Sequence, residues 1–157
     1  MTRKLFLSTS FMLLAVFSFA QKATKAYAIT GQSSGNFNWT DIREIDLSSG
    51  KVANTIFESG KTKFSLQTSI KTNRLLSAAK DVVLPTQSMV AAAAYDKKHD
   101  KLFFTPMRIG ELRWLDMSSK TGNQKFYTVQ NQLLTAANVN EEANQITRMT
   151  IAADGNG

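Results

Sequence analysis

The chain alternates between short apolar runs and polar turns, with little of the longer period that is typical of amphipathic helices. Gly, Asn, Asp and Ser gather between the runs, as they do in turns that connect strands. A first group of runs predicts strands at 26–30, 42–47 and 52–57. The same pattern returns further on and predicts an all-β protein. The second group of predicted strands comprises residues 89–95, 102–105, 112–117 and 126–129.

Two segments depart from this pattern. Residues 71–80 and 132–144 contain apolar side chains at spacings that suit a short amphipathic helix or an irregular crossover between groups of strands. We interpret both as connectors.

An internal repeat relates the two groups of strands. Residues 42–49 align without gaps on residues 112–119, and both copies read apolar, Arg, variable, apolar, Asp, apolar, Ser, Ser. Each copy then reaches a glycine. A carboxylate in this setting accepts backbone N–H bonds within a tight turn, and the glycine supplies a positive φ angle. We therefore predict structural turn residues in both copies, Asp46 with Gly50 and Asp116 with Gly122.

A second correspondence joins Tyr95-Asp96 to Ala153-Asp154. Each pair ends an apolar run and opens a polar turn. A third repeat therefore begins at about residue 146, and we expect the reading frame to continue beyond Gly157.

The segment 45–52, apolar-Asp-apolar-Ser-Ser-Gly-Lys-apolar, resembles the turn between the two outer strands of blades in the WD40-like, YVTN and quinoprotein-like β-propeller superfamily. This resemblance implies an incomplete β-propeller with two four-stranded antiparallel blades, at about 26–66 and 89–130, and the start of a third at about 146–157. No Gly-His and Trp-Asp pair marks a true WD40 blade. The aromatic residue of quinoprotein repeats is also missing after Val52, so no cofactor is expected.

The N-terminal twenty residues have the pattern of a secretory signal peptide. Arg3 and Lys4 precede an apolar stretch at 5–19, and the small residue Ala20 precedes a cleavage site before Gln21. We expect residues 1–20 to be a signal peptide helix and 21–25 a polar leader. The glutamine after the site resembles exported proteins of the Bacteroidetes. The pattern predicts a protein of the periplasm or the extracellular space without a stable membrane anchor.

Composition narrows the function classes. The chain carries a formal charge of +7, and removal of Arg3 and Lys4 leaves 17 positive against 12 negative residues, or +5. These charges are spread along the chain and form no basic stripe, so we expect no nucleic-acid partner. The chain contains no cysteine, which excludes disulfides, thiolate zinc sites and thiol catalysis.

Few residues could carry catalysis. His99 is the sole histidine of the sequence and lies in the charged segment 96–100, which we interpret as an exposed turn. Residues 154–157 lack the later ligands of a calcium loop. We predict no catalytic, cofactor-binding or metal-binding residue. Trp39, Trp114, Tyr95, Phe103 and Phe104 are interpreted as packing residues.

These observations favour a binding or scaffold module whose ligand is an unknown protein, glycan or small molecule. The alternative is a propeller hydrolase or lactonase whose catalytic residues lie mostly beyond Gly157. Propellers host many functions, so the fold does not decide between the two.

Overall fold

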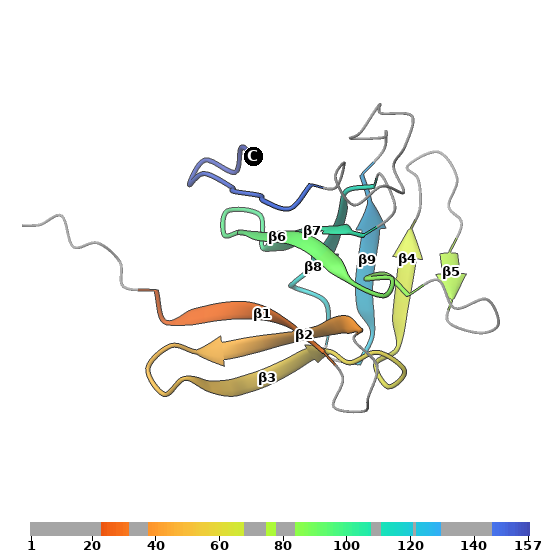
Figure 1. Cartoon of the computed structure of the whole chain (residues 1–157), viewed down its shortest axis with the longest axis horizontal. Coiled ribbons are helices and arrows are strands. Elements are labelled where there is room, and N and C mark those ends of the chain that lie inside the picture. The colour runs from red at the N-terminus through yellow and green to blue at the C-terminus, as the bar shows by residue number, and fades with distance from the viewer. Residues whose placement is uncertain are drawn as a thin grey trace, which may run out of the picture.

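The computed structural model describes residues 23–31, 38–67, 75–77, 84–107, 111–120, 122–129 and 146–157. Within these ranges the chain forms strands and turns and no helix (Figure 1). The predicted all-β class is therefore confirmed.

The first sheet contains β1 (Lys25–Gly31), β2 (Trp39–Asp46) and β3 (Lys51–Phe57). The three strands pair antiparallel in chain order, with β2 in the middle. They correspond to the strands predicted at 26–30, 42–47 and 52–57, with β2 beginning three residues early.

The second sheet is built around four strands that also follow chain order. They are β6 (Val90–Asp96), β7 (Lys101–Pro106), β8 (Arg113–Asp116) and β9 (Gln124–Thr128). Each pairs antiparallel with the next. All four strands predicted between 89 and 129 are present.

Two short strands extend the second sheet beyond β9. The strand β4 (Phe64–Gln67) pairs parallel with β9, and β5 (Leu75–Ser77) pairs antiparallel with β4. The expectation of a four-stranded antiparallel unit at 26–66 is therefore wrong, because β4 does not join β3. Phe64 packs against Phe126 of β9, with ring centroids 6.0 Å apart, and this contact draws the strand to the second sheet.

The first sheet repeats the register of β7–β9 along β1–β2 and, at the end of the sheet beside the Asp turn, between β2 and β3. In both sheets a lysine, an aspartate and a lysine face one another across three successive strands. The residue after the aspartate, Leu47 or Met117, donates its N–H to the carbonyl before the first of these strands at 3.0 Å in both cases. The repeat thus covers three strands, and among the described residues the first sheet has no counterpart of β6. The paired residues are Lys25, Asp46 and Lys51 in β1–β3 and Lys101, Asp116 and Lys125 in β7–β9.

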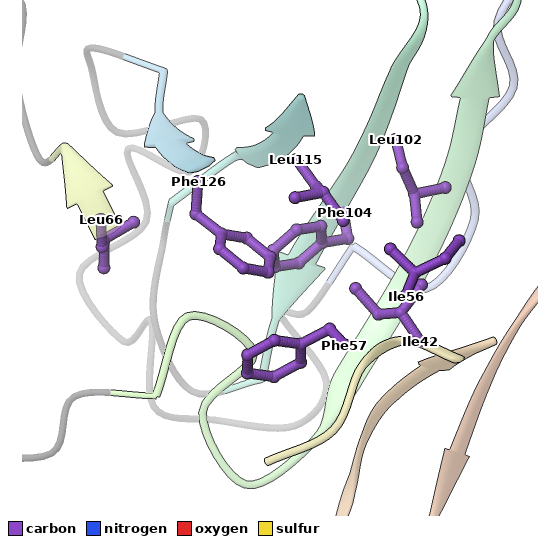
Figure 2. Close-up of a cluster of buried hydrophobic side chains, with 8 residues drawn as sticks. All are labelled: Ile42, Ile56, Phe57, Leu66, Leu102, Phe104, Leu115 and Phe126. Atoms are coloured by element: carbon purple, nitrogen blue, oxygen red, sulfur yellow. The ribbon is translucent and has the colours of Figure 1, made fainter. Parts of the chain in front are cut away.

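The hydrophobic core lies between the two sheets. Phe126 is central, with its ring centroid 5.1 Å from that of Phe57 and 6.1 Å from that of Phe104. These edge-to-face contacts join β3 of the first sheet to β7 and β9 of the second. Figure 2 shows the cluster, which consists of Ile42, Ile56, Phe57, Leu66, Leu102, Phe104, Leu115 and Phe126.

Two equivalent arginines are held in different ways. Arg113 is buried, binds Glu111 at 2.8 Å and donates to the carbonyls of Leu84 and Pro85. Arg113 therefore ties β8 to the loop before β6. Arg43 also has an acid two residues earlier, Asp41 at 3.4 Å, but its side chain is 31% exposed.

Several predicted features lie wholly or partly outside the described residues. These are the signal peptide at 1–20, the cleavage pair Ala20 and Gln21, and the connector at 132–144. Of the connector at 71–80, residues 75–77 form β5 rather than part of a helix.

Candidate functional site

The repeat turns hold their aspartates in local hydrogen bonds. The Oδ1 atom of Asp46 accepts the N–H of Ser48 at 2.7 Å and its hydroxyl at 2.6 Å. Asp116 accepts the same two groups of Ser118 at 3.0 and 2.6 Å. The Ser48 hydroxyl and N–H lower the pKa of Asp46. Both carboxylates thus stabilise the turns in which they lie.

The glycines of these turns adopt the left-handed backbone that the turn requires. Gly50 has a φ of 67° and Gly122 a φ of 88°. A side chain at either position would strain the backbone.

Asp96 and Asp154 form a second pair of related turns. Asp96 accepts the N–H of Lys98 at 2.9 Å, and Asp154 accepts that of Asn156 at 3.0 Å. Burial by itself would raise the pKa of Asp96, but hydrogen bonds from His99 and Lys98 lower it overall. The pKa of Asp154 is lowered chiefly by the Asn156 backbone.

These two turns lie against each other. The Lys98 Nζ donates to the Asp154 carbonyl at 2.9 Å, and a Cβ added at Gly155 would come within 2.7 Å of the His99 ring. His99 lies in a turn, with its side chain 47% exposed, and its Nδ1 is 2.6 Å from Asp96 Oδ2. The turn that follows β6 therefore contacts the C-terminal segment at residues 154–155.

A cleft of about 140 Å³ lies between the first sheet and the turns of the second. None of the four turn aspartates just described lines it. Its walls come from β1, β2 and β3 on one side and from the β6–β7 turn, the β8–β9 turn and β9 on the other. The lining residues are Lys25, Tyr27, Glu44, Asn54, Thr55, Ile56, Asp100, Met117, Ser119 and Gln124.

Charged and aromatic groups line the cleft. The Lys25 Nζ lies 4.0 Å from Glu44 Oε1 and 5.5 Å from the centre of the Tyr27 ring. The Tyr27 ring packs edge-on against Tyr95 at 4.7 Å, and the Tyr95 hydroxyl donates to Asp100 at 2.7 Å. The cleft therefore contains one ammonium group, of Lys25, and two carboxylates, of Glu44 and Asp100.

These contacts shift two ionisations. The pKa of Lys25 is raised, chiefly by its hydrogen bond to Tyr27; burial opposes this rise, and the charges of Tyr27, Glu44 and Asp100 add smaller increases. Burial raises the pKa of the Tyr95 hydroxyl, and the hydrogen bond to Asp100 adds to this. Lys25 stays charged and the tyrosine neutral at ordinary pH.

The cleft offers hydrogen-bonding groups of both kinds. Carboxylates accept, the ammonium donates, and the amide of Asn54 can do both. Among the residues that the structure describes, no group of three or more His, Asp or Glu side chains could hold a metal ion.

The aromatic residues interpreted above as packing residues differ in their burial. Phe104 is buried in the core, and Trp114 stacks on Tyr127 with ring centroids 4.1 Å apart. Trp39, in contrast, is 52% exposed, so its interpretation as a packing residue is wrong. It lies at the beginning of β2, where its backbone, rather than its ring, bonds to Ser88.

The residues of the cleft were not predicted from the sequence. Lys25, Glu44 and Asp100 come from three separate segments, and each resembles an ordinary surface charge. The available signal was the repeat itself, because Lys25 stands where Lys101 stands in the second unit.

In the described part of the chain, no helix is long and apolar enough to cross a membrane. Comparisons with protein-family models, with curated proteins and with solved structures find no match to this chain.

Proposed function

We propose that the protein is an exported binding or scaffold module of the β-propeller type, and that the cleft between its sheets takes a small hydroxyl-rich ligand such as a sugar. The observation that carries the proposal is the convergence of Lys25, Glu44 and Asp100 beside Tyr27 in one cleft. Carboxylates, amides and a tyrosine edge suit hydroxyl groups, which both donate and accept.

The blade-like architecture is supported by three features. Strands β6–β9 form a four-stranded antiparallel meander, β1–β2 repeat the register of β7–β8, and the Asp154 turn repeats the Asp96 turn. Four-stranded antiparallel repeats are the units of propellers.

Export is proposed from the signal sequence. Purification of the protein from outside the cytoplasm and sequencing of its N-terminus test this part. A mature chain that begins at Gln21 supports it, and a chain that retains residues 1–20 contradicts it.

A thermal-shift screen with neutral monosaccharides and disaccharides tests ligand binding. A ligand present at 100 times its Kd adds about 2.7 kcal/mol to the free energy of unfolding, which is a readily measured rise in Tm. We expect Glu44→Gln, in the cleft, to abolish this rise. Glu58→Gln is the matched control, because Glu58 pairs with Lys61 in an exposed turn that does not line the cleft.

Two outcomes would contradict the proposed ligand class. One is that no sugar of the panel raises Tm. The other is a rise that Glu44→Gln and Glu58→Gln leave equally intact, because the ligand would then bind elsewhere.

A further inference from the structure

In the described part of the chain, the first sheet matches β7–β9 and contains no strand that corresponds to β6. In the second sheet, β6 pairs along the outer edge of β7. The strand of the first sheet that corresponds to β7 is β1, because Lys25 lies opposite Asp46 as Lys101 lies opposite Asp116. Within the described part of the chain, β1 pairs with β2 alone. Among the described strands, its other edge has no partner that corresponds to β6.

The C-terminal segment has the features of such a strand. Asp154 repeats the turn of Asp96, which ends β6. In the residues before it, half-buried Met149 and Ile151 alternate with exposed Arg148, Thr150 and Ala152. This alternation is that of a strand with one covered face, yet no strand partner is assigned to residues 146–152 in the described structure.

These two incomplete parts lie on opposite sides of β6 in one molecule (Figure 1). On one side, Tyr27 of β1 packs against Tyr95. On the other, Thr105 of β7 donates to the Ile146 carbonyl at 3.0 Å, and Lys98 binds Asp154. The C-terminal segment of a chain therefore cannot reach its own β1 without leaving these contacts.

Corresponding faces of the two sheets also differ in how far they are buried. The positions of β7–β9 that form the core have apolar counterparts in β1–β3, but these counterparts are not in the core. Val52, the counterpart of Phe126, is 49% exposed. The core positions Leu102, Leu115 and Phe126 correspond to Ala26, Ile45 and Val52.

The opposite face of β7–β9 carries a row of large aromatic side chains. Phe103, Trp114 and Tyr127 stand side by side on adjacent strands and are each half-buried. Small side chains on the first sheet would fit between these large ones, as interdigitating sheet faces do.

We propose that two copies of this chain associate head to tail, with the first sheet of one copy covering the aromatic row of the other. Residues 146–152 of the second copy then pair antiparallel along β1 of the first. The result is a four-stranded sheet with the same order as β6–β9. The inference rests on the repeat and does not depend on the proposed ligand.

The repeat also fixes the register of the new pair. Asp96 faces Lys101 and Tyr95 faces Leu102 in the second sheet. By equivalence, Asp154 of one copy faces Lys25 of the other, and Ala153 faces Ala26.

Cysteine cross-linking tests this register, because the chain has no cysteine of its own. The Cβ atoms of directly opposed residues lie about 4.5 to 5.5 Å apart, close to what a disulfide needs. The full chain is prepared as two variants, Ala26→Cys and Ala153→Cys, and mixed under mild oxidation. We expect a disulfide-linked dimer of the two variants. As a control, Ala53→Cys, on the far edge strand β3, replaces Ala26→Cys and should give a severalfold lower yield.

Equal yields in both mixtures would overturn the proposal. So would an internal disulfide in the monomer when Ala26→Cys and Ala153→Cys are combined in one chain, because the strand would then come from the same copy. Light scattering of the unsubstituted full chain gives a separate check. A mass above that of one chain supports the association, whether the head-to-tail contact closes a ring or grows, and a monomer at every concentration refutes it.

Discussion

The sheets β1–β3 and β7–β9 share the register of their first two strands but differ in what covers them. In both, lysines flank a central aspartate, and the same backbone bond closes the end of the sheet at 3.0 Å. Yet Phe126 is 1% exposed, whereas its counterpart Val52 is 49% exposed. In these two sheets, local sequence sets the pairing of strands that follow one another in the chain, while burial depends on the neighbour that the fold supplies.

The largest expected difference between the two sheets lies at this pair of positions. Phe126→Ala removes a ring that contacts Phe57, Phe64 and Phe104, and we expect a loss of about 3 to 5 kcal/mol in the free energy of unfolding. Val52→Ala, at the exposed counterpart, should change the free energy by about 0.5 kcal/mol or less in the dissociated chain. Urea unfolding at low protein concentration measures both. Equal losses would contradict the burial difference.

The equivalent arginines provide a smaller contrast. Arg113→Ala leaves the carbonyls of Leu84 and Pro85 without their donor in a buried site, and we expect a cost of about 2 to 3 kcal/mol. Arg43→Ala should cost about 1 kcal/mol or less, since this side chain is partly solvated. The same urea titration compares them. A larger loss at Arg43 would show that the first sheet depends more on its arginine than its exposure indicates.

The smallest effect is the dependence of stability on acid. Asp46 in the first sheet and Asp96 in the second both have lowered pKa values, so their contribution is present above the ordinary value of 3.8 and is lost as pH falls through the folded pKa. Asp46→Asn and Asp96→Asn remove this titration while keeping an oxygen acceptor. Each variant should show a smaller fall in Tm than the parent chain between about pH 5 and about pH 3. A fall as large as that of the parent would mean that these turns do not couple to folding.

The order of the strands could be predicted from the sequence where the contacts that form them are between chain neighbours. The strands of the second unit follow alternation and turn residues, and the Asp-Ser-Ser pattern pointed to turns that the structure closes at Asp46 and Asp116. The acid that precedes each arginine, Asp41 or Glu111, extends this repeat but was missed, because the two acids differ in type.

The parallel pairing of β4 with β9 could not be read in the same way. It depends on the contact of Phe64 with Phe126, which are 62 positions apart in the chain. The cleft has the same origin, because Lys25, Glu44 and Asp100 meet only after the two sheets pack.

The sequence by itself therefore determined the all-β class, the repeated strand order and the chemistry of the turns, because hydrogen bonds between chain neighbours and alternating side chains set these features. Only the tertiary structure decided which copy of the repeat is buried, where β4 pairs and which charges share a cleft. The physical reason is that burial and charge proximity arise between segments far apart in the chain, and identical local patterns acquire different surroundings when they pack.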